Sequence, residues 1–292
     1  MDKKDILEKL FSSDRQLPTL PVLLTKLNQM MADPMTSNKK IADLITKDPS
    51  MVIKILKMSN SAMYSKRQKI TNLTNAITFL GMEKLKTLIL QISLVNVFNF
   101  PNDGIPEFSI TTFWEHSLGT AYFTNLITAK LQLPVDDNYY IAGLLHDIGK
   151  LVVYQFYPKK FNEIIKKQIA ENLIDYEAEE QVLGVTHNDI GAYLAQKWNF
   201  NPDIIQVIEQ HHNATQSHGL MVAIVQISNL FAKTAGLCFP WDNKCFELVG
   251  DSNWEVIAQH SQHANIEEMV LEMMNESDSV KESVKELLSP SK

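Results

Sequence analysis

The spacing of apolar residues constrains the fold most, because it follows the period of an α-helix along nearly the whole chain. Between residues 77 and 95, apolar residues recur at intervals of three and four, the spacing of one buried helix face. These residues are Ile77, Leu80, Leu85, Leu88, Ile89, Ile92 and Val95. Hairpin patterns are missing, since no Asn-Gly or Asp-Gly dipeptide lies between alternating apolar runs. The sequence therefore predicts an all-α protein.

Three segments contain the residues that commonly start a helix. Asp48-Pro49 and Asn201-Pro202 each place a capping side chain before a proline at the first helical position. Thr186 and Asp189 have the spacing of a capping box, in which each side chain accepts a hydrogen bond from the other residue's backbone. We expect a helix to begin at each of these points.

The Pro- and Gly-containing stretch around Asp103-Gly104 is the best candidate for a boundary between two helical lobes. The charge changes there: residues 1–100 hold 15 Lys and Arg against 8 Asp and Glu, and residues 101–292 hold 12 against 26. This asymmetry fits electrostatic docking of the lobes, an acidic or phosphate-rich partner, or simply solvated helix faces. We predict a basic N-terminal lobe (1–104), a second lobe (105–235) and a C-terminal extension (236–292) with a short amphipathic helix at 279–288.

Composition and the lack of targeting segments indicate a soluble cytoplasmic protein. Hydrophobic residues make up 45% of the chain and charged residues 21%, which is ordinary for a globular protein. The two cysteines, Cys238 and Cys245, form no disulfide framework and suit a reducing compartment. The first ten residues lack the apolar core of a signal peptide, and the apolar stretch at 88–98 is too short to span a bilayer. We therefore expect no membrane partner.

Metal-ligand side chains occur at five places in the second lobe. They are His116, the pair His146-Asp147, His187, the pair His211-His212, and Asn229. Each lies in its own predicted helix or at a helix end, so a helical bundle can direct all of them inwards. Neutral imidazoles and a carboxylate are the ligands of borderline and transition-metal dications. The alternative is a metal-free polar core in which histidine and aspartate satisfy each other's hydrogen bonds.

The ordered series of segments resembles the HD superfamily, which is named for its His-Asp pair and whose catalytic members are metal-dependent phosphohydrolases. It resembles more closely the HDOD branch of bacterial signalling proteins, over about residues 13–235. LPTLP (17–21) and residues 48–65 and 76–90 resemble the helical lobe that precedes the HD core. FWEHSLGTA, AGLLHDIGKLV, VTHNDIGAYLAQKWNF and IIQVIEQHH resemble the core itself. The resemblance implies a two-lobed helical fold with an HD-like core in residues 105–235.

Carried over residue by residue, the resemblance implies a metal site and one catalytic position. The implied metal ligands are His116, His146, Asp147, His187, and His211 or His212. Lys150 matches a lysine that faces the phosphate in catalytic relatives. Those relatives end their ligand set with an aspartate, and its counterpart here is Asn229, which brings an oxygen but no negative charge. The expected cofactor is a divalent metal such as Mn, Fe, Zn, Ni or Mg.

Two functions are compatible with this resemblance. A phosphomonoesterase or phosphodiesterase would use a mono- or dinuclear site to lower the pKa of a bound water to about 7, with Lys150 stabilising the developing charge. A regulatory HDOD module would instead bind metal or a ligand without turnover. Asn229, and the absence of the GYP extension of cyclic-dinucleotide phosphodiesterases, favour the module. Its expected partner is a signalling protein or a phosphate-containing small ligand rather than a nucleic acid.

Overall fold

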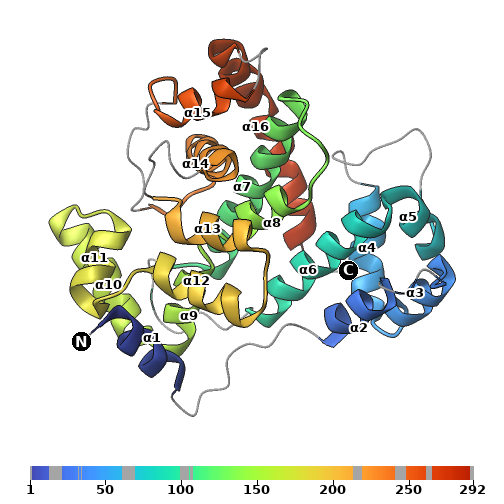
Figure 1. Ribbon diagram of the computed structural model, residues 1–292, viewed down its shortest axis with the longest axis horizontal. Coiled ribbons are helices and arrows are strands. Elements are labelled where there is room, and N and C mark those ends of the chain that lie inside the picture. Colours follow the sequence, from blue (N-terminus) through green and yellow to red (C-terminus); the bar gives the residue numbers. More distant parts are fainter. Residues whose placement is uncertain are drawn as a thin grey trace. The chain divides into compact units, whose positions relative to one another are not determined.

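The computed structural model describes residues 2–12, 22–31, 33, 35–60, 70–98, 105, 108–212, 219–240, 248–260 and 265–289. Nearly all of these residues lie in α-helices or in the turns between them, and these ranges contain no β-strand (Figure 1). The prediction of an all-α fold is therefore confirmed. No helix in these ranges is both long enough and apolar enough to cross a membrane.

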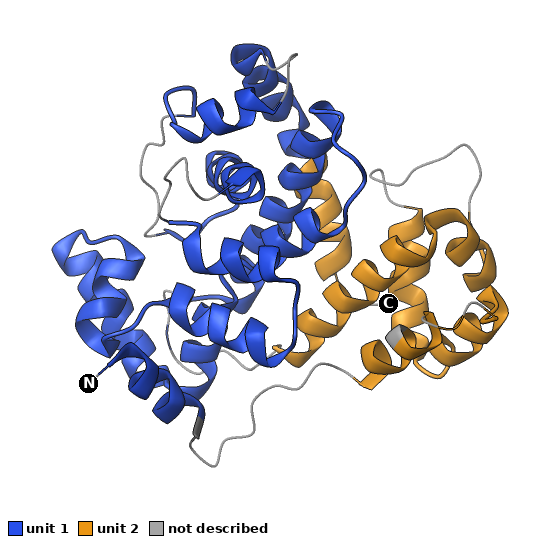
Figure 2. Cartoon of the chain, viewed as in Figure 1, with its two compact units in different colours: residues 1–17, 100–278 blue, residues 18–99, 279–292 orange. Residues whose placement is uncertain are grey.

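The helices form two compact units, coloured separately in Figure 2. Unit 1 comprises residues 1–17 and 100–278, and unit 2 comprises residues 18–99 and 279–292. The predicted boundary at Asp103-Gly104 and the LPTLP segment at 17–21 lie outside the residues that the structure describes.

Unit 1 is built from one N-terminal helix and a long series of later ones. They are α1 (Lys3–Ser12), α7 (Ile110–Lys130), α8 (Asn138–Leu145), α9 (Ile148–Phe156), α10 (Pro158–Glu171), α11 (Asp175–Leu183), α12 (His187–Lys197), α13 (Pro202–Gln210), α14 (Gly219–Thr234) and α15 (Asn253–Gln259). Unit 2 contains α2 (Val22–Met31), α3 (Asn38–Ile45), α4 (Pro49–Ser59), α5 (Leu73–Leu80) and α6 (Met82–Val97). The last helix, α16 (Ile266–Leu288), begins in the residues of unit 1 and ends in those of unit 2.

All three predicted helix starts are confirmed. Asp48 and Asn201 cap α4 and α13 by accepting a hydrogen bond from a backbone N–H of the first turn, and a proline follows each of them. At the start of α12, the Thr186 hydroxyl accepts from the Asp189 N–H, while the Asp189 carboxylate accepts from the Thr186 N–H at 2.9 Å. These starts are local in sequence, which is why they could be predicted.

Two helices differ from the sequence prediction. The periodic run at 77–95 does not form one continuous helix, because Gly81 separates α5 from α6 with a φ of 78°. This left-handed conformation is easily reached only by glycine. The C-terminal apolar stripe, with Val280 and Val284 buried, lies in a helix that begins at Ile266 and is therefore not short.

Six closely packed helices surround the polar side chains in the interior of unit 1. Helix α7 contacts α8 and α14, and α12 contacts α9 and α13. Two glycines allow α9 and α12 to approach each other. A Cβ at Gly149 would overlap the carbonyl oxygen of His187, and a Cβ at Gly191 would lie 3.2 Å from the backbone nitrogen of Gly149. The glycine of the HDIGK segment is therefore required by helix packing.

Candidate metal centre

Separate elements of unit 1 carry the ligand-type residues. His116 lies within α7, His187 is the first residue of α12, and His211 and His212 directly follow α13. The pair His146-Asp147 forms the turn between α8 and α9, at the adjoining ends of these two helices. That turn directs both side chains inwards, and both are almost completely buried.

The ring nitrogens of the histidines converge on a small volume. His116 Nε2 lies 3.3 Å from His146 Nε2, and His187 Nε2 lies 3.3 Å from His211 Nε2. His212 Nε2 lies 3.1 Å from His187 Nε2. Two nitrogens that each bind one ion at about 2.1 Å can be at most about 4.2 Å apart, so every one of these separations fits a shared ion.

Asp147 joins two possible ligand sets. Its Oδ2 lies 3.7 Å from His116 Nε2 and 3.5 Å from His146 Nε2. Its Oδ1 lies 3.2 Å from His187 Nε2 and 3.3 Å from His211 Nε2. The ligand atoms of each set, His116 with His146 and Asp147, or Asp147 with His187, His211 and His212, lie within 4.8 Å of one another. The buried carboxylate could therefore bridge two ions.

The outer nitrogen of four rings is held by an acceptor, which orients the inner nitrogen towards Asp147. The acceptors are the Leu237 oxygen for His116 (2.8 Å), the Gly143 oxygen for His146 (2.7 Å), the Ile208 oxygen for His211 (3.0 Å) and the Glu179 carboxylate for His187 (2.7 Å). Carbonyl and carboxylate oxygens only accept, so each Nδ1 carries the proton and each neutral ring presents an Nε2 lone pair. These neutral tautomers are the ones that bind metals.

Charges and burial keep most of the rings neutral. Burial lowers the pKa of His116 to about 4 and lowers those of His146 and His212 well below the usual range. His187 differs: burial favours its neutral form, but the carboxylates of Glu179 and Asp147 together outweigh burial and raise the pKa to about 9. Without a cation, His187 is protonated, while the Nε2 lone pairs of the other rings face one another and the Asp147 carboxylate. Among the described residues, Asp147 Oδ1 also lacks a hydrogen bond of good geometry. A divalent cation would remove the repulsion between these lone pairs.

Lys150 borders the cluster and forms two ion pairs. Its ammonium lies 2.9 Å from Asp147 Oδ2 and 2.6 Å from Asp175 Oδ2. Burial alone would lower the pKa of Lys150, but the two carboxylates outweigh burial and raise it. Burial likewise favours a protonated Asp147, but the Lys150 charge together with the surrounding histidines holds the pKa of that carboxyl well below its usual range.

Two residues that contact the site, Asp175 and Glu179, were not predicted from the sequence. They lie one turn apart on α11, and Glu179 accepts from both the backbone nitrogen and Nδ1 of His187, each at 2.7 Å. Helix α11 contains two further acidic residues, Glu177 and Glu180, and both are exposed. Only the i, i+4 spacing of the inward pair could have marked it, and that spacing is common on solvated helices.

Asn229 lies in α14 on a face that borders the cluster. One turn before it, Gln226 Nε2 donates to the carbonyl oxygen of His211 at 2.7 Å. One turn after it, the charge of Lys233 contributes to the lowered pKa of His116. Asn229 itself is buried, and among the described residues its Oδ1 has no hydrogen-bond donor. A buried amide oxygen without a donor is compatible with the predicted role of Asn229 as a neutral ligand.

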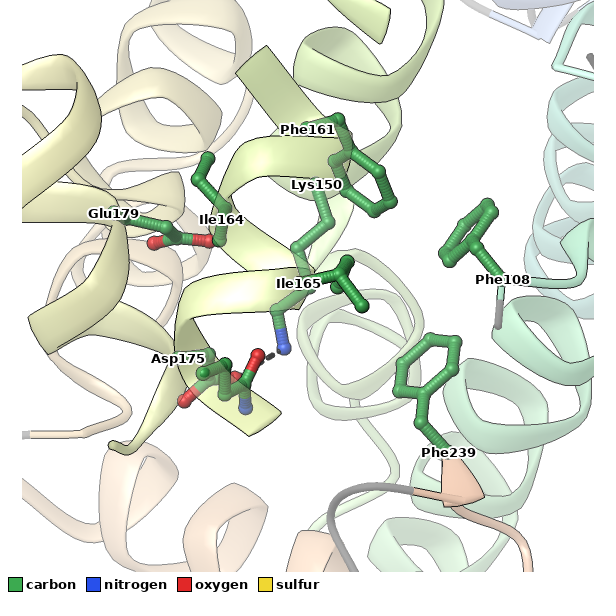
Figure 3. Close-up of a pocket in the computed structure, with 9 residues that line it drawn as sticks. Phe108, Lys150, Phe161, Ile164, Ile165, Asp175, Glu179 and Phe239 are labelled. Atoms are coloured by element: carbon green, nitrogen blue, oxygen red, sulfur yellow. Dashed lines mark hydrogen bonds and ion pairs between the residues drawn. The ribbon is translucent and has the colours of Figure 1, made fainter. Parts of the chain in front are cut away.

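A pocket opens next to Lys150, as Figure 3 shows. Its lining combines apolar side chains with an ammonium, an amide and two carboxylates. The apolar lining residues are Phe108, Phe161, Ile164, Ile165 and Phe239, and the polar ones are Lys150, Gln168, Asp175 and Glu179. The pocket therefore provides space beside Lys150, Asp175 and Glu179, the residues that border the histidine cluster.

Comparison with known proteins identifies relatives with the same helical architecture. The family model described as HDOD domain matches residues 17–214. The crystal structure of an HDOD domain protein with unknown function from Geobacter sulfurreducens is 25% identical, with a TM-score of 0.84 over 99% of each chain.

Two curated proteins are similar to this chain over only part of their own length. An uncharacterized protein of Treponema pallidum is 26% identical over 218 residues, which are 73% of this chain and 42% of the relative. Ribonuclease Y of Mycoplasma mycoides is 32% identical over 114 residues, which are 39% of this chain and 17% of the relative. The chain therefore spans less than half the length of these two relatives.

Proposed function

The chain belongs to the HDOD domain family, and from this premise we propose that it is a regulatory signalling module that binds divalent metal without catalytic turnover. A single observation supports metal binding most strongly. Inward-facing imidazole nitrogens surround one buried carboxylate, and acceptors outside the cluster hold the opposite nitrogen of four of these rings.

The donor set divides naturally between two ions. His116 and His146 would hold the first ion, His187, His211 and His212 would hold the second, and Asp147 would bridge them. Imidazole-rich sets of this kind suit Fe, Ni and Zn better than Mg, which prefers oxygen ligands. The neutral tautomers of His116, His146 and His211 are ready to bind without a change of hydrogen bonding, whereas His187 would release a proton when it binds metal.

Two features favour regulation over hydrolysis. Asn229 supplies a neutral oxygen where the catalytic relatives carry an aspartate, so the site lacks one negative charge. Lys150, the residue expected to face a phosphate, is already paired with Asp147 and Asp175. The module would transmit the occupancy of the cluster to a protein partner in a signalling pathway.

The second candidate is a metal-dependent phosphohydrolase, and the bridging position of Asp147 favours it. Two bound ions would supply an activated water and would polarise a phosphoryl oxygen. Lys150 would then stabilise the charge that develops on the phosphoryl group, provided that its ammonium left Asp175.

Metal analysis together with a hydrolysis assay tests the proposal. The purified protein should contain divalent metal or bind Mn²⁺ or Zn²⁺ in isothermal titration. The metal-loaded protein should not hydrolyse a nitrophenyl phosphodiester. Robust turnover that a chelator abolishes would replace the module by the phosphohydrolase, and failure to bind any divalent metal would contradict both.

Substitution at residue 229 tests the assignment of the last ligand. Asn229→Asp should tighten metal binding by about 10–100-fold, because an anionic oxygen replaces a neutral dipole next to the cluster. Asn199→Asp adds the same charge at an exposed position of the same unit and serves as the control. Equal affinities in wild type and Asn229→Asp would show that residue 229 does not belong to the site.

A further inference from the structure

The first turn of α11 covers the most accessible edge of the histidine cluster. The His212 side chain is 17% exposed, whereas those of His116, His146, His187 and His211 are at most 2% exposed. The Tyr176 ring lies 5.3 Å from the His212 ring, and Asp175 Oδ1 lies 3.9 Å from His212 Nε2. A ligand that reaches the cluster along this edge must therefore meet α11.

Asp175 also forms an ion pair with the Lys150 ammonium at this edge. Its carboxylate lies 2.6 Å from the Lys150 ammonium, and Figure 3 shows this pair among the residues that line the pocket. Lys150 and Asp175 come from different helices and are 25 residues apart in the chain. The same ammonium contacts Asp147, which belongs to both ligand sets. The pair thus links α11 directly to the proposed metal site.

Helix α11 has little apolar packing of its own. Its buried residues are Ala178 and Glu179, and the second of these is a carboxylate bound to His187. Residues in the left-handed conformation lie on both sides of the helix, Asn172 with a φ of 52° and Gly184 with a φ of 75°. Segments with few buried apolar contacts open at a low free-energy cost. Polar contacts to the cluster therefore contribute much of what holds α11 in place.

We propose that Asp175 acts as an internal anion for Lys150, and that a phosphate-bearing ligand displaces it together with the first turn of α11. The inference rests on the proposed function, because it names the ligand class and the moving element of the same site. A phosphate oxygen within hydrogen-bond reach of Lys150 would lie close to the Asp175 carboxylate, and the two negative charges would repel each other. Displacement of Asp175 removes the repulsion between its carboxylate and the phosphate. Ligand binding therefore moves the first turn of α11.

Titration with inorganic phosphate tests the role of Asp175 in the full-length, metal-loaded protein. Asp175→Asn removes the competing charge with little change of shape and should bind phosphate about tenfold more tightly than wild type. Glu180→Gln makes the same charge change at an exposed position of the same helix and should leave the affinity unaltered. Lys150→Gln should lose phosphate binding. Equal phosphate affinity in wild type and Asp175→Asn would overturn the proposal.

Hydrogen exchange of the unmodified protein provides a second test that does not depend on any variant folding. Saturating phosphate should speed the exchange of the amides at 178–183 in α11, while those of α7 stay protected. Phosphate binding that leaves α11 exchange unchanged, or no phosphate binding by wild type and Asp175→Asn alike, would overturn the inference. Metal content measured on the same samples separates these outcomes from a failure of the proposed metal site.

Discussion

The interiors of the two units differ in the chemistry of the side chains that they bury. Unit 1 buries ionisable groups, namely His116, His146, Asp147, Lys150, Glu179, His187 and His211. Over its described residues, unit 2 buries only neutral polar side chains, which are Ser59, Thr87, Gln91, Ser93 and Ser283. Burial of ionisable groups costs free energy unless they are paired or bind a cation. The contrast indicates that the interior of unit 1 is built for binding and that of unit 2 for packing.

Of the substitutions that test this contrast, replacement of Asp147 should have the largest effect, a loss of metal affinity in unit 1. Asp147→Asn removes the only carboxylate that both ligand sets share, and we expect metal affinity to fall at least about 1,000-fold, since even a change behind the ligands costs about 10–100-fold. Isothermal titration with Zn²⁺ measures the change. Asp189→Asn, a carboxylate of the same unit at the start of α12, is the control. Unchanged Zn²⁺ stoichiometry and affinity in Asp147→Asn would contradict the two-ion assignment.

A core truncation in unit 2 should give the opposite result. Ile55 is fully buried in α4, and Ile55→Ala should lower the free energy of unfolding by about 3 kcal/mol through lost burial and a residual cavity. Metal affinity below the unfolding transition should not change. Chemical denaturation and metal titration of the same variant check both expectations. A large loss of metal affinity would show that the two interiors are coupled.

A substitution behind the ligands should have an intermediate effect. Glu179→Gln keeps the shape of the side chain but removes the charge that raises the pKa of His187. The Nε2 of His187 becomes a weaker metal ligand because the ring is less basic. We expect metal affinity to fall by about tenfold or somewhat more. Glu180→Gln, at the neighbouring exposed position, should bind metal as wild type does. An effect of equal size in the two variants would point to general electrostatics rather than to the His187 hydrogen bond.

The smallest effect concerns the capping box of α12. Asp189→Ala should lower the free energy of unfolding by about 1 kcal/mol at neutral pH. Burial favours the protonated Asp189, but hydrogen bonds from Thr186 and Lys3 outweigh burial and lower its pKa in the folded protein. The stabilisation is therefore complete above the ordinary value of 3.8 and is lost as the pH falls through the lower folded value. Thermal unfolding of both proteins between pH 3 and 7 measures this; a constant difference would exclude the carboxylate as its source.

The elements that depend on nearby residues could be predicted from the sequence. Helical periodicity reports which residues share one face, and a capping residue acts on amides within its own first turn, so the helix starts at Asp48, Thr186 and Asn201 were accessible. The order of the histidines along successive helices also indicated a common site. The break at Gly81 was missed because apolar periodicity continued on both sides of it.

The partners that complete the site could be found only in the tertiary structure. The acceptors for His116 and His211 are backbone oxygens of Leu237 and Ile208, and a backbone oxygen has no sequence signature. Asp175 and Glu179 share α11 with two exposed carboxylates, and only the packing of α11 beside Lys150 and His187 distinguishes the inward pair. Periodicity and capping are encoded within a few residues. The ionisation, tautomers and pairing of the cluster depend instead on groups that meet only when distant helices pack together.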